Sequence, residues 1–233
     1  MNFRNNINYF KKKDSIKGIG AGLLIVGLFW LWLGIGYIGW IAYFFMILSI
    51  PSGFIMFILG STLSSNDADM DEYIKKNCEG LELDLEGDKN FSKRILKNKE
   101  PNVTGGYEYN GEGLMFRKDK RGTWRSSKYT KSVIYVLSDA LYINSRTFSL
   151  ISDDTENRLL EISYDTVESV EMKNEEHVIV AGKNSFKIKK DRLVIKYGEG
   201  MTFSAPMNND IRSEEFIEML NRMVLKAKKQ KEE

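Results

Sequence analysis

The sequence has very few of the residues that build metal sites, disulfides and thiol or imidazole catalysis. Cys78 is its only cysteine and His177 its only histidine. A single cysteine excludes an intramolecular disulfide, and one residue of each kind excludes a zinc site made of several thiolates and imidazoles. His177 stands beside Glu175 and Glu176 at the start of an apolar run, so we expect a surface or strand-end histidine rather than a general base. We expect no metal and no cofactor.

Phosphate-binding and nucleophile motifs are missing as well. Residues 34–39 spell a glycine-rich dinucleotide fingerprint, but no strand–helix–strand unit surrounds them. Residues 182–185 have neither the spacing nor the following helix of a phosphate loop. Ser126 and Ser127 lack a nucleophile elbow and a recognisable base. These absences argue against an enzyme, and the alternative that remains open is an enzyme whose carboxylates meet only in the folded chain.

Charged residues are absent from Gly18 to Asn66, a run of 49 residues rich in Leu, Ile, Phe, Gly, Trp and Met. A hydrocarbon core of ~30 Å is crossed by ~20 helical residues, so the run is long enough for two crossings. A buried helix pair of a soluble protein and a cleavable signal peptide both explain an uninterrupted run of this length less well. Because no ionisable residue lies within the run, a transporter is not expected.

Residues that weaken helices or favour a membrane interface gather in the middle of this run. They are Gly34, Gly36, Tyr37, Gly39 and Trp40. Glycine lowers helix stability, and the amphipathic rings of tyrosine and tryptophan favour the headgroup region. The sequence therefore predicts a transmembrane helical hairpin over residues 18–66, with one helix near 18–35 and the other near 39–62.

Positive charge lies on one side of this predicted hairpin. The basic residues before it are Arg4, Lys11, Lys12, Lys13 and Lys17. The same stretch contains a single aspartate, and the predicted turn has no Lys or Arg. Cytoplasmic segments beside membrane helices carry an excess of Lys and Arg. We therefore expect a basic cytoplasmic arm over residues 1–17. The chain is predicted to be a multi-pass protein of the cell membrane, with two helices and both termini in the cytoplasm.

Glycines recur every seven residues on both predicted helices. They are Gly20, Gly27 and Gly34 on the first and Gly53 and Gly60 on the second. Small residues at regular spacing let two membrane helices approach closely. The stripe Gly20, Gly27, Gly34 predicts either a tight pair within one chain or a homodimer. The general frequency of glycine in membrane helices explains the pattern equally well.

Residues 67–104 are predicted to be a helical linker between the membrane and a folded domain. Apolar residues recur there at helical spacing, at Met70, Ile74, Cys78, Leu81 and Leu85. They predict an amphipathic helix of about 67–86, followed by a second short helix of about 88–99 that Asp88 caps. Alternation at Leu81, Leu83 and Leu85 allows a strand instead. We expect the segment to act as a spacer.

Residues 105–228 are predicted to form a β-rich domain, followed by a charged tail over 229–233. Short β-branched and aromatic runs alternate with turn signals until the last segment, whose apolar residues are Phe216, Leu220, Met223 and Leu225. These predict a helix of about 209–228, capped by Asp210 or Ser213. Seven or more strands followed by one helix predict an α+β domain, with a small bent sheet or open barrel closed by the C-terminal helix.

Several segments of this region carry a resemblance to a known family. They are a strand–turn–strand unit at 135–143, an aromatic and an acidic residue before an alternating strand at 162–170, the closing helix 214–225, and residues 122–129. Together they resemble the bacterial pleckstrin-homology-like (PH-like) domains of small membrane-anchored proteins of unassigned function. The resemblance covers about residues 105–228. It implies a binding or scaffolding module rather than an enzyme.

Positive charge gathers around one tryptophan between Arg117 and Lys131, with Asp119 as the only opposing charge. The candidate binding residues are Arg117, Lys118, Lys120, Arg121, Trp124, Arg125 and Lys128. A domain tethered at an anionic leaflet gains ~1 kcal/mol from each cation that reaches the surface. We therefore expect these residues to bind anionic lipid or a protein partner, the alternative being a solvated face. A net charge of +2 without a reading helix argues against nucleic acid.

Overall fold

The computed structural model describes most of the chain. The described residues are 3–11, 15–36, 39–62, 64–83, 91, 93, 94, 96, 100–181, 184–208 and 210–232. They form five α-helices and three antiparallel sheets, which confirms the predicted α+β class. The chain divides into two compact units, one of residues 1–71 with 117–123 and the other of residues 72–116 with 124–233.

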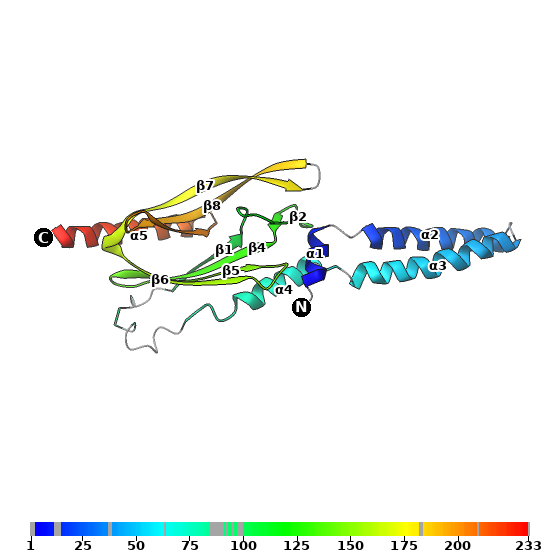
Figure 1. Ribbon diagram of the computed structural model, residues 1–233, viewed down its shortest axis with the longest axis horizontal. Helices are drawn as coiled ribbons and strands as arrows, with labels where there is room; N and C mark the ends of the chain where they lie inside the picture. Colours follow the sequence, from blue (N-terminus) through cyan, green and yellow to red (C-terminus); the bar gives the residue numbers. More distant parts are fainter. Residues whose placement is uncertain are drawn as a thin grey trace. The chain divides into compact units, whose positions relative to one another are not determined.

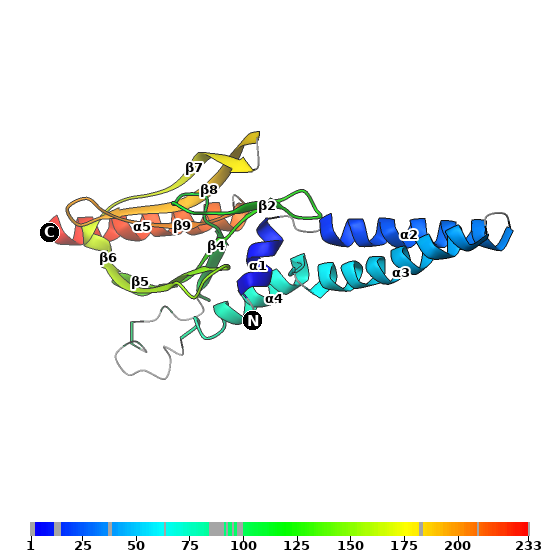
Figure 2. The same ribbon diagram turned by 45° about the vertical axis from the view of Figure 1, so that its right-hand side comes forward.

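The first unit contains three helices, α1 (Phe3–Phe10), α2 (Ser15–Gly36) and α3 (Gly39–Thr62). Helices α2 and α3 occupy the two ranges that the uncharged run predicts, whereas α1 lies in the stretch predicted only as a basic arm. Helices α2 and α3 run antiparallel and side by side, as Figure 1 and Figure 2 show. The connection at residues 37 and 38 lies outside the described residues.

Glycines bring α2 and α3 into close contact. A Cβ atom on Gly20 would lie 2.5 Å from the backbone nitrogen of Phe57, and one on Gly53 would lie 2.8 Å from a backbone nitrogen of α2. A Cβ atom on Gly27 would meet the side chain of Ile50 at 2.5 Å. No side chain tolerates contacts this short, so glycine is required where the two backbones approach each other.

The glycine stripe is thus used within one chain, which is one of its two predicted roles. Gly20 and Gly27 face α3, and the surroundings of Gly34 lie outside the described residues. A homodimer through Gly20, Gly27 and Gly34 stays a prediction. Such a dimer would have to compete with the packing of Gly20 and Gly27 against α3.

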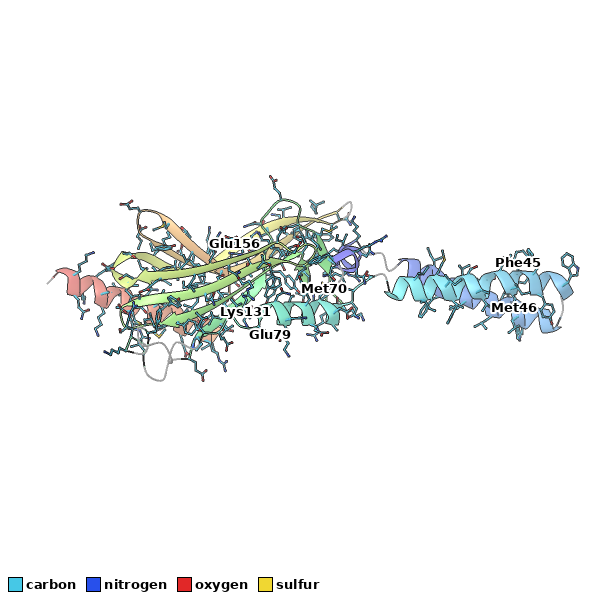
Figure 3. All side chains as sticks on the ribbon, turned by 60° about the horizontal axis from the view of Figure 1, so that its bottom comes forward. Phe45, Met46, Met70, Glu79, Lys131 and Glu156 are labelled. Atoms are coloured by element: carbon cyan, nitrogen blue, oxygen red, sulfur yellow. The ribbon has the colours of Figure 1, made fainter. Side chains whose placement is uncertain are left out.

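The outer surface of α2 and α3 is apolar. Its large exposed side chains include Ile25, Phe29, Trp32, Phe44, Ile47 and Phe54. Figure 3 shows side chains projecting from both helices, with Phe45 and Met46 labelled. Within the described residues one window, Tyr43–Gly60 on α3, is long and apolar enough to cross a membrane, and only 11% of it is buried. The apolar stretch found on α2, Gly18–Trp32, is shorter, so within the described residues one helix meets this criterion and the second crossing stays a prediction.

Helix α4 (Asp67–Cys78) begins with a reciprocal cap and ends earlier than its pattern predicts. The side-chain oxygen of Asn66 accepts a bond from the N–H of Asp69 (3.0 Å), and the Asp69 carboxylate accepts one from the N–H of Asn66 (2.8 Å). The helix stops well before residue 86 because Gly80 takes a left-handed conformation, with φ of 72°. Most of the predicted second helix, 88–99, lies outside the described residues.

The turn after α4 lies against strand β5 (Ala140–Ser149), where the sequence predicts a spacer. The ring of Tyr73, on α4, contacts Phe148 edge-on at a centroid distance of 6.3 Å. The side-chain amide of Asn144 donates to the carbonyl of Leu81 at 2.8 Å, and Leu81 itself is buried. Residues 72–83 are therefore packed as part of the second unit, and a spacer role of the whole segment 67–104 stays a prediction.

Two larger sheets form the body of the second unit (Figure 1). The first has the order β1 (Asn102–Tyr107), β4 (Lys128–Val136), β5 and β6 (Thr155–Ser163). The second has the order β7 (Val167–Ala181), β8 (Asn184–Tyr197) and β9 (Met201–Pro206). A short 3-10 helix, η1 (Tyr164–Thr166), joins β6 to β7, and β2 (Phe116–Lys118) pairs with β3 (Trp124–Ser126) in a sheet of its own.

Strands β7 and β8 are longer than predicted and form an extended ribbon (Figure 1). The sequence predicts separate strands at 167–171 and 177–180, and at 185–188 and 192–195. The structure joins the first two in β7 and the last two in β8. The charged residues between the predicted strands pair across the ribbon. Glu175 lies opposite Lys190, and Glu176 lies opposite Lys189. Opposite charges on neighbouring strands stabilise the ladder, so the strands continue where apolar patterning alone predicts a break.

The main core lies between the two larger sheets and is closed by α5 (Ile211–Glu232), as Figure 2 shows. Buried residues of β4 to β9 pack there against Phe216, Leu220 and Val224 of α5. Phe216 and Leu220 are predicted core residues. Leu225, also on the predicted apolar face, is 59% exposed, because the buried stripe continues through Val224 at the four-residue spacing of a helix.

Asp210 caps the N-terminus of α5, as one of the two predicted caps. Its carboxylate accepts a bond from the backbone N–H of Ser213 at 2.9 Å. This bond favours the ionised form and so lowers the pKa of the Asp210 carboxyl. A negative charge at this end also suits the helix dipole, which makes the start of the closing helix well defined.

Leu220→Ala is expected to destabilise the second unit by roughly 2–5 kcal/mol, because the truncation leaves a cavity beneath α5. The matched control is Leu225→Ala, the same substitution on the exposed side of the same helix, with an expected change within about 0.5 kcal/mol. Denaturant unfolding of the full-length protein in mild detergent, followed by near-UV circular dichroism, measures both. Equal unfolding midpoints for the two variants would contradict the position of Leu220 in the core.

Candidate functional site

The basic segment forms the turn between β2 and β3, and Asp119 organises that turn. The Asp119 carboxylate accepts bonds from the backbone N–H groups of Arg121 (3.0 Å) and Thr123 (2.8 Å). Gly122 donates its N–H to the carbonyl of Asp119 at 3.1 Å and has φ of 85°, a conformation that favours glycine. The sequence predicts the turn but identifies Asp119 only as an opposing charge.

We call residues 117–123 the basic tip. Three of its cations, Lys118, Lys120 and Arg121, are exposed. Because the Asp119 carboxylate is bonded to backbone groups of the turn, its charge is directed toward the tip's own backbone. The tip therefore presents three positive side chains to its surroundings, as the sequence predicts for part of the candidate site.

Arg117 has a different role, because it is held by Tyr9 of α1. Its guanidinium lies over the Tyr9 ring at 4.3 Å and donates to the Tyr9 carbonyl at 2.5 Å. Tyr9 is fully buried, so this stacked, hydrogen-bonded contact is shielded from water. Arg117 therefore fixes the tip to α1, whereas the sequence predicts it as a binding residue.

Asp67, at the start of α4, makes the second contact with the basic tip. One of its carboxylate oxygens accepts a bond from the Tyr9 hydroxyl (2.6 Å), and the other accepts one from the backbone N–H of Lys120 (3.1 Å). Hydrogen bonds to an ionised acceptor are stronger than neutral ones. Asp67 therefore joins α1, α4 and the tip. Tyr9 and Asp67 carry no sequence signal for this role, since their partners are remote along the chain.

The same cluster reaches the residues that follow α3. The backbone N–H of Ser65 donates to the carbonyl of Asn5 at 3.2 Å, and the Ser65 hydroxyl donates to the side chain of Asn6 at 2.7 Å. Ser65 lies directly between the end of α3 and the start of α4. Helix α1, the end of the long apolar helices and the basic tip are therefore parts of one packed assembly within the first unit.

The remaining candidate residues belong to the second unit and are less exposed. Trp124 is half-buried, with its ring 4.8 Å from that of Phe186. Arg125 is buried, and its guanidinium lies 5.9 Å from the centre of the Tyr107 ring. Lys128 is half-buried in β4. Of the predicted binding residues, the structure thus gathers Lys118, Lys120 and Arg121 on one exposed turn, whereas Trp124, Arg125 and Lys128 belong to the second unit.

His177 is buried in the middle of β7, which corrects the expectation of a surface or strand-end histidine. Its ring stacks on Tyr109 at 5.8 Å, and its Nδ1 atom lies 2.8 Å from the side-chain oxygen of Asn110. Nearby, Arg192 and Glu108 form an ion pair at 2.6 Å. The hydrogen bond to Asn110 makes burial of the imidazole acceptable, and it gives His177 a structural role.

A cleft of about 460 Å³ beside the β5–β6 turn is lined by several carboxylates and hydroxyls. Among its described lining residues, Asp154 accepts a bond from Ser152 (2.6 Å) and Glu156 accepts one from Arg158 (2.6 Å). Both carboxylates are exposed to water. Each of these two carboxylates thus has its own hydrogen-bond partner at the surface of the cleft.

Metal ligands and known relatives give no further assignment. Within the described residues, no group of three or more His, Cys, Asp or Glu side chains is arranged to hold a metal ion. Comparison of the chain with protein-family models, with curated proteins and with solved structures found no match. The function is therefore inferred from the arrangement of the basic tip.

Asp67→Asn is expected to loosen the basic tip, because the amide offers one acceptor oxygen where the carboxylate offers two. Loss of a hydrogen bond to a charged group costs ~1.5–3 kcal/mol, which corresponds to roughly tenfold or greater acceleration of amide exchange. Hydrogen exchange of peptides covering 117–123 measures it. Glu72→Gln removes the same charge from an exposed position on α4 and should leave the tip unchanged. Equal exchange in both variants would show that Asp67 does not hold the tip.

Proposed function

We propose that this protein is a membrane-anchored binding module whose basic tip engages anionic lipid headgroups on the cytoplasmic side. In this proposal α2 and α3 cross the bilayer as a hairpin, and the second unit is a PH-like domain. The observation that carries the proposal is the packing of the basic tip with the residues at the end of α3, through Tyr9, Asp67 and Ser65.

The membrane anchor is supported by the exposed apolar surface of α2 and α3. A core helix of a soluble protein is mostly buried, whereas only 11% of the apolar window Tyr43–Gly60 is buried. Lipid is the natural surrounding for side chains such as Phe29, Trp32 and Phe54, which project from the pair. The glycine contacts between α2 and α3 also suit a bilayer, where close backbone packing replaces the hydrophobic effect.

The PH-like assignment is supported by the architecture of the second unit. Two antiparallel sheets enclose one core, and a C-terminal helix closes it. A sheet structure closed by a final helix is the arrangement that the resemblance to bacterial PH-like domains implies. Such a domain is a frame on which loops bind partners, so its function depends on the loops rather than on the core.

Anionic lipid is the best-supported ligand of the tip. If α3 crosses the bilayer, Ser65 and Asp67 lie near the membrane surface, and the tip that they hold lies there too. Each exposed cation at an anionic surface contributes ~1 kcal/mol, and tethering makes weak contacts effective. A protein partner remains the second ligand class for the same three cations. An enzyme has less support, since the carboxylate-lined cleft is open and solvated.

The hairpin proposal predicts that residues 67–233 lie in the cytoplasm. A reporter that is active only in the cytoplasm should be active when fused after residue 233. A fusion after residue 36, which retains one crossing only, should be inactive, and a reporter specific for the outer side should give the opposite pattern. Activity of the outer-side reporter after residue 233 would overturn the two-crossing arrangement.

Combined replacement of Lys118, Lys120 and Arg121 by glutamine should weaken binding of phosphatidylglycerol by about a hundredfold, since three cations contribute roughly 3 kcal/mol. Titration of a short-chain phosphatidylglycerol into the full-length protein in neutral detergent, followed by native mass spectrometry, measures the affinity. The control replaces Lys226, Lys228 and Lys229 of α5 by glutamine, an equal change in charge. Rising salt should weaken binding to the wild type. Equal affinities of the two triple variants would refute lipid recognition by the tip.

A further inference from the structure

The end of the β7–β8 ribbon has an apolar outer face. Val178 and Val180 are 63% and 65% exposed, and both point to the same side because strand side chains alternate. The residues paired with them, Lys187 and Ser185, lie on that face as well. Two exposed valines at adjacent positions of one face form an apolar patch, whose exposure to water is unfavourable.

The opposite face of the ribbon end is packed against aromatic residues, among them Phe116 of β2 and Trp124 of β3. Ile179 and Ile188 are buried there in a cluster with Tyr109. The same cluster includes Phe186 of the ribbon and Trp124 of β3, whose rings are 4.8 Å apart. Trp124 is the residue that directly follows the basic tip in the sequence. The inner face of the ribbon end is thus covered by aromatic residues of the second unit.

The chemistry of the outer face fits an anionic lipid surface. Lys187 and Lys189 are exposed on this face, and Lys187 pairs with Glu176 at 2.7 Å. Valines can enter the boundary between headgroups and acyl chains, while lysine stems lie along apolar surface and keep their ammonium groups among the phosphates. The two lysines outnumber Glu176, the carboxylate on the same face, by one charge, and this excess complements the negative charge of the cytoplasmic leaflet.

We propose that the outer face of the β7–β8 ribbon end, centred on Val178 and Val180, inserts into the headgroup region of the bilayer that anchors the chain. This inference rests on the proposed membrane function and extends it, because it adds an apolar contact to the electrostatic contact of the basic tip. The two contacts use different forces. Salt weakens the attraction between the cations of the tip and anionic lipid, whereas the apolar contact of the valines is insensitive to screening.

The test places an environment-sensitive fluorophore, nitrobenzoxadiazole, on the ribbon of the full-length protein in lipid nanodiscs. The labelled position is Val180→Cys, in a background in which Cys78, the only native cysteine, is replaced by alanine. Lipid carrying a nitroxide near the headgroup should quench the label at position 180. The emission of this label should also be blue-shifted relative to that of a label at a water-exposed control position. That control is Leu159→Cys on β6, a similarly exposed apolar position (57%), where no quenching is expected.

Val178→Asp in the labelled protein should reduce the quenching, because a carboxylate beside the label is repelled by anionic lipid. A label at position 180 that is quenched no more than the label at position 159 would overturn the inference. Disulfide cross-linking between copies through Val180→Cys would also overturn it, by showing that a second copy covers the patch. Glutamine replacement of the tip cations separates the two proposals, since lipid affinity reports on the tip and quenching at position 180 reports on the ribbon.

Discussion

The apolar side chains on the outer surface of α2 and α3 impose the constraint on which the first unit depends. Side chains such as Phe29, Trp32 and Phe54 are more than half exposed, and in the proposed function lipid surrounds them. Helices suit it because they satisfy their own backbone hydrogen bonds. Gly20 and Gly53 allow the backbones of the two helices to approach each other closely. Polar groups of the unit form a hydrogen-bonded cluster around Ser65 and Asp67, just after the end of α3.

Asp67 illustrates how one carboxylate organises that polar end. Its two oxygens accept bonds from a buried hydroxyl on α1 and a backbone N–H on the basic tip. The same charge lies in the first turn of α4, where it suits the helix dipole. Arg117 completes the arrangement through the Tyr9 ring and carbonyl. The basic tip is thus held by a carboxylate and an aromatic ring. One of its own cations, Arg117, forms the contact with the ring.

Local patterns in the sequence were sufficient for the elements that depend on local physics. The uncharged run predicts α2 and α3, and the spacing of Phe216 and Leu220 predicts the closing helix with its buried face. Elements held by remote contacts were not predictable in this way. Helix α1 has only eight residues, and its position is fixed by contacts with Asp67 and Ser65, which are remote in the sequence. The ribbon β7–β8 continues through charged residues because each pairs across the strands, which a single strand's pattern does not reveal.

The candidate site shows the same limit in chemical terms. Counting charges between Arg117 and Lys128 treats every cation as equivalent, yet burial separates them into distinct roles. Arg117 stacks on Tyr9, and Arg125 is buried near Tyr107. Lys118, Lys120 and Arg121, on the turn itself, are exposed to water, where a surface of opposite sign can meet them. In the proposed function, the exposed cations of the segment bind lipid, whereas Arg117 holds the turn to α1.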